Sequence, residues 1–247
     1  MDYTKEVKPY TVEGSKKEQV SNMFNNIAQY YDFLNHFLSL GIDKLWRKRV
    51  IKELKKSNPR HLLDVATGTA DVAITVANSM EVEKVIGLDI AIEMLEIGRK
   101  KVRKQNLDPT VELISGDAEN LPFEDNTFDA ITVAFGVRNF EHLDKGLSEM
   151  RRVLKPQGKL VVLEFSKPTL FPFKQLFNFY FSTILPFVGK ITSKDPKAYR
   201  YLYESVQAFP DGKAFLSRLD AVGYEKIKQI PLTFGISSIY LGTKKSI

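Results

Sequence analysis

Acidic side chains stand near the ends of several short apolar runs between residues 61 and 139. The runs cover residues 62–65, 85–88, 111–114 and 130–133, and Asp64, Asp89 and Asp117 lie at or close to the ends of the first three. Such runs are typical of parallel strands buried on both faces, and the carboxyl ends of these strands meet at one edge of the sheet. We therefore expect three carboxylates on one rim, where they can bind a ligand.

The loop after the first run, residues 66–71, indicates which ligand suits this rim. A dinucleotide-binding loop has the pattern G-x-G-x-x-G and brings backbone amides against a pyrophosphate. Here the only glycine is Gly68, and the carboxylate of Asp71 would repel a phosphate. A cationic sulfonium with a free amino acid end suits such a loop better, so we expect S-adenosylmethionine as the cofactor.

Six residues are expected to bind this cofactor. They are Asp64, Gly68, Thr69, Asp89, Asp117 and Ala118. The glycine lets the backbone approach the ligand, with the first carboxylate and the hydroxyl beside it. Asp89 lies about 20 residues downstream, where a carboxylate accepts both ribose hydroxyls, and Asp117 is placed for the adenine amino group beside the amide of Ala118. Taken singly these could be turn or N-cap residues; their order at successive strand ends favours a cofactor site.

The apolar pattern predicts one α/β domain with a Rossmann-like fold of the class I S-adenosylmethionine-dependent methyltransferase type, with a mostly parallel seven-stranded sheet. Residues 1–16 are polar and expected to be mobile. Residues 17–56 carry an amphipathic helical stripe that Gly41 interrupts, so we expect two helices, either packed on the sheet or acting as a lid. The cofactor-binding body is expected at residues 57–168. Residues 213–247 are expected to add a helix and an antiparallel hairpin.

An aromatic-rich insert is expected at residues 169–212. Its most unusual stretch, residues 170–191, is interrupted by Pro172, Lys174 and Pro186, so it is not a clean membrane-spanning helix of ~20 residues. We expect it to roof a flat apolar substrate, because aromatic side chains supply area and stacking. An aromatic core helix and a shallow contact with a membrane interface are the alternatives.

Composition excludes several other functions. The chain has no cysteine, and its three histidines lack metal-ligand spacing, so we expect no disulfide, thiolate chemistry or metal site. The net charge of +6 comes from scattered lysines without a basic stripe, so no nucleic acid partner is expected, although an attraction to anionic lipid is compatible with it. The N-terminus has no apolar signal segment, so we expect a cytoplasmic protein.

The chain resembles the quinone C-methyltransferase family of menaquinone and ubiquinone biosynthesis. The resemblance covers nearly the whole length and rests on residues 20–48, 125–140, 151–168 and 199–210. Two departures stand out. Members usually carry a GGTGD loop where this chain has ATGTAD at residues 66–71, and many have a serine at the position of Ala134. Non-glycine residues are strained at positive φ, so the first departure bears on cofactor affinity.

The resemblance implies C-methylation of the reduced ring of demethylmenaquinol, an isoprenoid quinol, to give menaquinol. The ring carbon becomes nucleophilic when an adjacent hydroxyl loses its proton, so the protein must stabilise a phenolate. Arg138 is our candidate, because a guanidinium stays charged and suits an oxyanion. Asn139 is expected to hydrogen-bond the second ring oxygen, and Tyr31 and Tyr201 are further candidate donors.

The sequence leaves several alternatives open. Arg138 could instead form an ion pair with Glu141 or Asp144. The acceptor could be a benzoquinol or another lipophilic ring, and the altered loop also allows a non-catalytic protein that binds S-adenosylmethionine. A peripheral contact with the inner face of the membrane is compatible with a lipid-soluble substrate. The oligomeric state is open, with a homodimer among the options.

Overall fold

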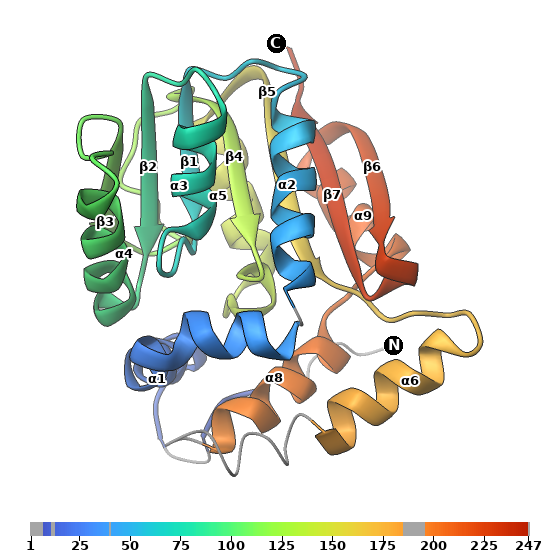
Figure 1. Ribbon diagram of the computed structural model, residues 1–247. Coiled ribbons are helices and arrows are strands. Elements are labelled where there is room, and N and C mark those ends of the chain that lie inside the picture. Colours follow the sequence, from blue (N-terminus) through green and yellow to red (C-terminus); the bar gives the residue numbers. More distant parts are fainter. Residues whose placement is uncertain (1–6, 11–12, 40, 185–195, 247) are drawn as a thin grey trace.

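Seven strands form one sheet in the spatial order β3-β2-β1-β4-β5-β7-β6 (Figure 1). The computed structural model describes residues 7–10, 13–39, 41–184 and 196–246. The strands are β1 (His61–Val65), β2 (Lys84–Asp89), β3 (Val111–Ser115), β4 (Phe128–Ala134), β5 (Leu154–Phe165), β6 (Tyr224–Leu232) and β7 (Ser237–Lys244). β1 to β5 are mutually parallel, whereas β7 is antiparallel to both β5 and β6. The predicted parallel sheet with a C-terminal antiparallel hairpin is confirmed.

Helices cover both faces of the sheet, with α2, α3 and α4 in front of it in Figure 1 and α5 and α9 behind it. Their bounds are α2 (Ile42–Leu54), α3 (Asp71–Ser79), α4 (Ile92–Lys104), α5 (Leu143–Val153) and α9 (Lys213–Val222). Successive strand residues point to opposite faces, so Leu62 and Val161 join the core cluster of α2, α3 and α4, while Leu63 and Val162 join that of α5 and α9. The sheet is therefore buried on both faces.

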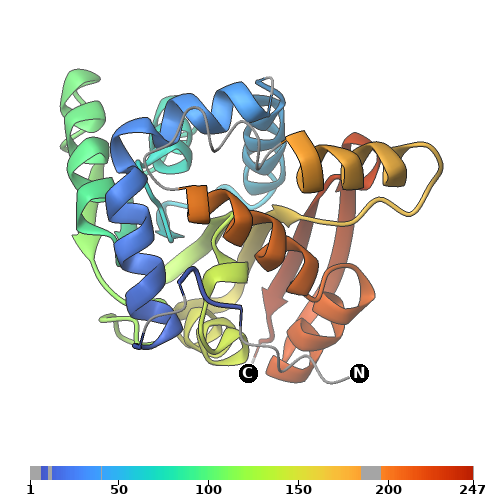
Figure 2. The same ribbon diagram turned by 90° about the horizontal axis from the view of Figure 1, so that it is seen from below.

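A third group of helices lies across the carboxyl edge of the parallel strands. Figure 2 shows this group from below, with α1, α8 and α6 side by side. Their bounds, with those of the short helical segments beside them, are α1 (Lys16–Leu38), η1 (Val137–Asn139), α6 (Phe173–Phe179), η2 (Tyr180–Ile184), α8 (Pro196–Ala208) and η3 (Thr233–Gly235). α1 contacts α4 and η1, and α8 also contacts η1. These helices cover the strand ends that carry the expected site residues.

A glycine lies between the covering layer and the helices on the sheet. Gly41 has a φ of 76° between α1 and α2, a left-handed conformation that ends the first helix and lets the chain turn towards the sheet. Residues 7–10 pack beside α1, where the amide of Tyr10 donates to Gln19 Oε1 at 3.0 Å. Of the aromatic stretch 170–191, residues 170–184 form α6 and η2 with the turn before them, and residues 185–191 lie outside the described residues.

Candidate active site

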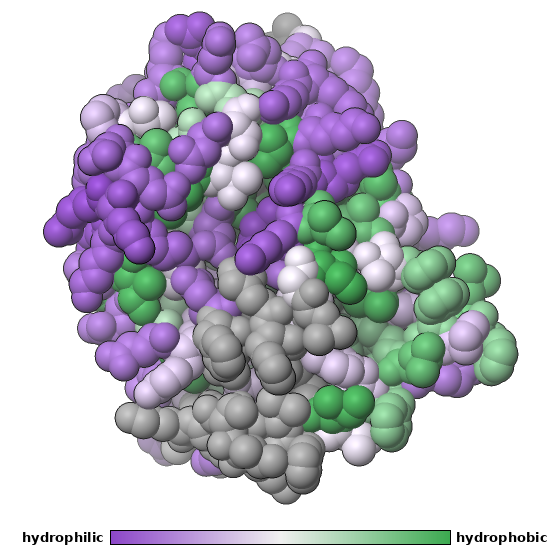
Figure 3. Space-filling view, viewed as in Figure 1, coloured by the Kyte–Doolittle hydropathy of each residue, from purple (hydrophilic) through white to green (hydrophobic). Residues whose placement is uncertain are grey.

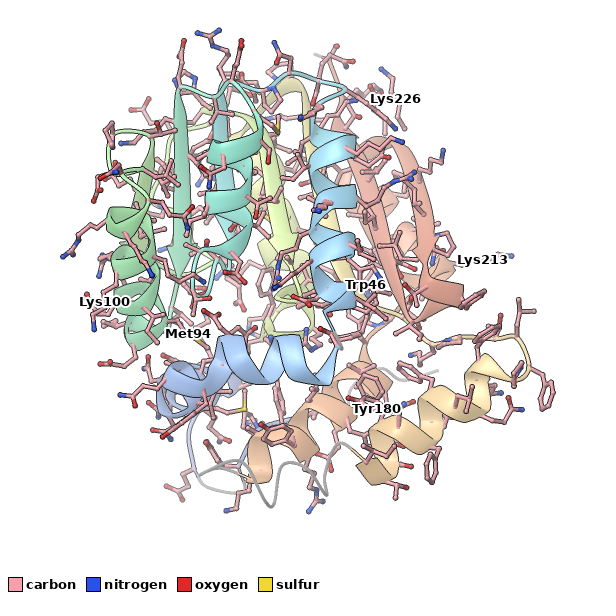
Figure 4. All side chains as sticks on the ribbon, in the orientation of Figure 1. Trp46, Met94, Lys100, Tyr180, Lys213 and Lys226 are labelled. Carbon is pink, nitrogen blue, oxygen red and sulfur yellow. The ribbon has the colours of Figure 1, made fainter. Side chains whose placement is uncertain are left out.

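A pocket of about 690 Å³ opens at the carboxyl edge of the sheet beneath α1. Four of the six predicted cofactor residues line it, namely Gly68, Asp89, Asp117 and Ala118. The other walls come from α1, from Met94 of α4 (Figure 4) and from the end of β4 with the loop that follows it. We call this space the rim pocket. Strand ends that are far apart in the sequence meet here, as the apolar runs predicted.

Asp89 anchors the loop that follows β1. One of its carboxylate oxygens accepts the amide of Gly68 at 2.7 Å, and the other accepts the amide of Ala91 at 2.8 Å. Gly68 has a φ of 57°, in the left-handed region that glycine adopts without strain. Burial raises the pKa of Asp89, and the amides of Ala91 and Gly68 oppose this rise. Each carboxylate oxygen keeps a further lone pair for a ligand in the rim pocket.

Asp64 and Thr69 do not line the rim pocket. Asp64 is 1% exposed, and its oxygens accept the hydroxyls of Thr132 and Thr67, each at 2.6 Å. Burial raises the pKa of Asp64 to about 6. Thr69 is also buried, and its hydroxyl donates to Asp32 Oδ1 of α1 at 2.5 Å. These two residues hold the loop and the covering helix from behind the pocket wall, which differs from the direct cofactor contact predicted for them.

Two alanines in this loop have left-handed backbone conformations. Ala66 has a φ of 53° and Ala70 a φ of 66°, a region that glycine adopts more readily than alanine. A residue with a Cβ pays about 1–2 kcal/mol in this region, because the Cβ approaches the next carbonyl oxygen. Two non-glycine residues of this loop therefore have the backbone conformation that we expected to be strained.

Asp117 pairs with a lysine of the covering helix. Lys17 Nζ lies 2.7 Å from Asp117 Oδ2 and 3.4 Å from Glu119 Oε2. Glu119 is buried and also accepts the amides of Glu141 and His142 at 2.9 and 3.0 Å. The adenine end predicted at Asp117 is thus bordered by α1, the loop after β3 and the loop after η1.

A second and larger pocket, of about 1890 Å³, lies between α1, α2, α6 and α8. Figure 4 shows Trp46 of α2 and Tyr180 of the insert, two of its wall residues. The remaining lining is mostly aromatic and aliphatic and includes Met23, Ile27, Phe165, Phe177, Phe181, Tyr199 and Ile236. We call this space the aromatic pocket. The described part of the aromatic stretch therefore forms one wall of this pocket.

The two pockets meet at shared wall residues. Phe24, Tyr31 and Phe135 line both of them. Phe135 has a φ of 58°, and its ring packs on Trp46 and Phe165 with centroid distances of 5.9 and 4.7 Å. A non-glycine residue with positive φ is costly and is found mostly where the surrounding structure enforces it, often at functional sites. This backbone conformation places an aromatic ring at the boundary between the pockets.

Arg138 lies in the wall of the aromatic pocket, and its partner is Glu164 at the end of β5. The Arg138 Nη1 atom donates to Glu164 Oε1 at 2.8 Å, and the two side chains are 7% and 0% exposed. Burial raises the pKa of Glu164, and the charge of Arg138 opposes this rise. The alternative partners considered from the sequence were wrong, since Asp144 pairs with Arg218 and Glu141 accepts the amide of Lys16. Glu164 holds the guanidinium in place from the sheet side.

Three buried polar atoms near the boundary have no hydrogen-bond partner within the described part of the chain. They are Arg138 Nε, Asn139 Oδ1 and the hydroxyl oxygen of Tyr201. Arg138 and Tyr201 line the aromatic pocket, whereas Asn139 lines the rim pocket. Buried polar groups are nearly always hydrogen-bonded, so such atoms call for a partner from a ligand or from water. Two donors and an acceptor are thus available where the pockets adjoin.

Sequence reasoning missed three positioning residues. Thr67 and Thr132 hold Asp64, and Glu164 holds Arg138. Glu164 ends the apolar stretch of the fifth strand, so the same strand-end rule that found Asp89 could have found it. Thr132 carried no such signal, because a hydroxyl inside an apolar run also suits a strand, and Thr67 is one of several small residues of the loop after β1.

Comparison with known proteins identifies the relationship. The sequence profile of the ubiE/COQ5 methyltransferase family matches residues 12–244. The chain belongs to this family. A demethylmenaquinone methyltransferase of Bacteroides fragilis is 49% identical over 99% of this chain and 100% of the relative, and one of Porphyromonas gingivalis is 42% identical over the same shares. A ubiquinone/menaquinone biosynthesis C-methyltransferase of Citrifermentans bemidjiense is 44% identical over 93% of this chain and 97% of the relative.

Solved structures share the fold. An S-adenosylmethionine-dependent methyltransferase of Aquifex aeolicus superposes with a TM-score of 0.58 at 21% identity, over 80% of this chain and 89% of its own. A putative methyltransferase of Methanococcus maripaludis reaches 0.61 at 19% identity, over 96% and 98%. The predicted Rossmann-like methyltransferase fold of this ubiE/COQ5 family member is confirmed. Within the described residues, none of its helices combines the length and the apolar character needed to cross a bilayer.

Proposed function

We propose that this protein transfers a methyl group from S-adenosylmethionine to a ring carbon of demethylmenaquinol and so produces menaquinol. One observation carries the proposal: a pocket rimmed by carboxylates adjoins a larger aromatic pocket, and the two share Phe24, Tyr31 and Phe135. The names of the Bacteroides and Porphyromonas relatives support the same substrate. A lipid-soluble quinol is met at a membrane surface, so peripheral contact with the inner face of the membrane belongs to the proposal.

The residues of the rim pocket fit S-adenosylmethionine. Asp89 offers free lone pairs to ribose hydroxyls, and Asp117 with the amide of Ala118 offers an acceptor and a donor to adenine. Gly68 leaves room for the ligand, since the nearest atom to a Cβ added there is 4.0 Å away on Tyr31. Carboxylates also suit the positive charge of the donor, which supplies an electrophilic methyl group when bound. Asp64 and Thr69 support this site through the loop and do not contact the ligand in our proposal.

The aromatic pocket fits a flat ring with an apolar tail. Its walls bring Trp46, Phe165 and Tyr180 around the space, and such rings stack on a naphthoquinol and cover an isoprenoid chain. This pocket is larger than the rim pocket, so in our proposal it takes part of the tail as well as the ring. Alignment of the ring carbon with the methyl group, with water excluded, gives most of the rate through proximity and orientation.

Arg138, Tyr201 and Asn139 are suited to hold the ring oxygens. Arg138 Nε is a free charged donor for the phenolate, and its location in a buried wall strengthens that interaction. Burial raises the pKa of Tyr201, which keeps its hydroxyl protonated as a donor. Asn139 Oδ1 accepts a hydrogen bond from the second ring hydroxyl, and Tyr31 is placed at the boundary to fix the ring. Glu164 acts through Arg138 and is a positioning residue.

Methyl transfer with labelled S-adenosylmethionine and reduced demethylmenaquinone in detergent tests the proposal. Arg138→Ala would leave the buried Glu164 carboxylate unpaired, which costs stability. We therefore use Arg138→Lys and the double variant Arg138→Met/Glu164→Gln. Loss of the charged donor is expected to lower kcat by about 100-fold or more in the double variant, with little change in the affinity for S-adenosylmethionine, because Arg138 lies outside the rim pocket.

Arg218→Ala is the matched control, since it removes an arginine whose ion pair with Asp144 lies on the surface, and it should retain full turnover. Wild-type protein that binds S-adenosylmethionine in a calorimetric titration but methylates neither naphthoquinol nor benzoquinol acceptors would support a non-catalytic binding protein instead. Preference for a benzoquinol would change the substrate and keep the reaction. Full activity of the double variant would remove Arg138 from the mechanism.

A further inference from the structure

A cluster of exposed apolar side chains lies at one corner of the molecule, over α6 and the turn between β6 and β7. Its members are Leu170, Phe171, Leu176, Phe179, Ile184 and Phe234. We call this cluster the apolar tip. Phe171 is 81% exposed, Leu170 66% and Phe234 64%. Figure 3 shows hydrophobic atoms gathered over α6 at this corner. A contiguous patch of exposed apolar side chains is typical of an interaction surface, whereas single exposed apolar residues are not.

The apolar tip is continuous with the aromatic pocket. Leu176, Phe179 and Ile184 are exposed and also line that pocket, so they form its border towards solvent. Phe173 lines the pocket as well, and its ring stacks on Phe234 of the tip with a centroid distance of 3.9 Å. A ligand that leaves the pocket on this side therefore passes directly onto the exposed apolar surface.

The charge of the surrounding segment favours one kind of partner. In the described part of this segment, Lys167 pairs with Asp211 and Arg200 pairs with Glu204. Lys174 is exposed on α6 among the tip residues, and residues 165–184 carry no acidic side chain at all. An apolar surface that carries an exposed lysine and has no acidic residue in its own segment matches the acyl boundary and the anionic headgroups of a lipid bilayer.

We infer that the apolar tip docks on the surface of a bilayer that contains anionic lipid, with the aromatic pocket open towards the lipid. This inference rests on the proposed function, which gives the protein a reason to bind the bilayer. The isoprenoid tail of the substrate would pass from the bilayer between Leu176, Phe179 and Ile184 into the pocket. The charge argues for lipid over a second copy of this chain, because residues 165–184 offer Lys174 no acidic partner, so two such tips brought together would place like charges near each other.

Flotation of the full chain with phosphatidylcholine vesicles, with and without phosphatidylglycerol, tests the docking surface. Wild-type protein is expected to float with the mixed vesicles and much less with phosphatidylcholine alone. The Leu170→Ser/Phe171→Ser variant removes tip side chains that do not line either pocket, and it should lower the partition coefficient about tenfold or more on both kinds of vesicle. Lys174→Glu should lower it about tenfold on the anionic vesicles only.

The matched control is Ile92→Ser, which removes a 54% exposed side chain from α4 near β3, at the opposite edge of the sheet from the hairpin that carries Phe234, and should bind vesicles like the wild type. Wild-type protein that stays unbound, or a tip variant that floats like the wild type, would overturn the inference. A tip variant that changes only a dimer into a monomer in light scattering would assign the surface to a second copy and would also overturn it.

Measurements of turnover distinguish a failure of the docking surface from a failure of the proposed function. The Leu170→Ser/Phe171→Ser variant should methylate a short-tailed quinol in solution at the wild-type rate and a long-tailed quinol in vesicles more slowly. Wild-type protein that binds vesicles but methylates neither quinol would refute the proposed function and leave the docking surface standing. Equal rates of wild type and variant on the vesicle-bound quinol would contradict the docking surface alone.

Discussion

At the residue scale, Asp64 is a buried carboxylate held by two hydroxyls behind the wall of the rim pocket. Its two oxygens accept the hydroxyls of Thr67 and Thr132, and Asp89 adds a nearby negative charge. Burial raises the pKa of Asp64 from 3.8 to about 6, because the charged form loses its hydration. The folded chain therefore holds the proton more tightly than the unfolded chain does, and stability depends on pH through this residue.

We predict that Asp64→Asn flattens the pH dependence of stability between pH 4 and 6. The contribution of a group with a raised pKa is fully present below its unfolded pKa and is lost as the pH rises through the folded one. The wild type should therefore lose about 3 kcal/mol of unfolding free energy from this residue over that window, and the asparagine variant should not. Urea unfolding at several pH values measures this. Asp108→Asn, at an exposed position, should keep the wild-type slope, and an unchanged slope in Asp64→Asn would contradict the prediction.

The site residues near the strand ends differ in how well the sequence predicted their positions. Gly68, Asp89 and Asp117 line the rim pocket, as expected for residues that follow the ends of parallel strands. Asp64 and Thr69 were placed there by the same rule, yet Asp64 pairs in register with Thr132 of the neighbouring strand and is enclosed by it. The direction of a side chain at a strand end depends on the partner strand, and the order of the strands is a property of the folded sheet.

At the scale of elements, the loop after β1 combines an anchored glycine with strained alanines. Ala66 and Ala70 both have positive φ, whereas Ala73 lies in the regular helix α3. The two loop alanines differ in burial, since Ala70 is 0% exposed and Ala66 is half-buried. Substitution by glycine therefore separates backbone strain from the packing of a methyl group.

We predict that Ala66→Gly raises the free energy of unfolding by about 0.5–1 kcal/mol. Relief of about 1–2 kcal/mol of strain outweighs the greater entropy of glycine in the unfolded chain, about 0.5–1 kcal/mol. Ala70→Gly should be nearly neutral, because it also loses a buried methyl group worth about 0.8 kcal/mol. Ala73→Gly, the helical control, should lower stability by about 2 kcal/mol. Urea denaturation gives all three values, and a destabilised Ala66→Gly would show that the backbone there is not strained.

The helices and the hairpin were more predictable than the insert. The apolar spacing in residues 17–56 fixed two helices, and the strand patterns around residue 235 fixed the hairpin, because period and turn residues are local properties. For the insert, the sequence indicated only a high aromatic content and not which side chains face the pocket. Its division into pocket-facing side chains such as Phe177 and exposed ones such as Phe171 depends on its packing against α8 and η3, which no local pattern contains.

At the scale of the whole molecule, the rim pocket gathers segments from most of the first 141 residues. Its lining includes one residue from each of four segments: Lys17 of α1, Gly68 after β1, Asp89 at the end of β2 and Asp117 after β3. Each of these segments is tied to another, through the pairs of Lys17 with Asp117 and of Asp89 with Gly68. A ligand bound across them should therefore stabilise the fold as a unit.

We predict that S-adenosylmethionine at about 100 times its Kd stabilises the protein by about 2.7 kcal/mol, which raises Tm by about 5–10 °C for a chain of this size. Nicotinamide adenine dinucleotide at the same concentration should leave Tm unchanged, since the loop after β1 lacks the glycines that admit a pyrophosphate. Asp89→Asn should reduce the shift to less than half, because hydrogen bonds to a charged group contribute about 1.5–3 kcal/mol each. Asp108→Asn should keep the full shift. A dinucleotide that stabilised the wild type as strongly as S-adenosylmethionine would refute the assignment of this pocket.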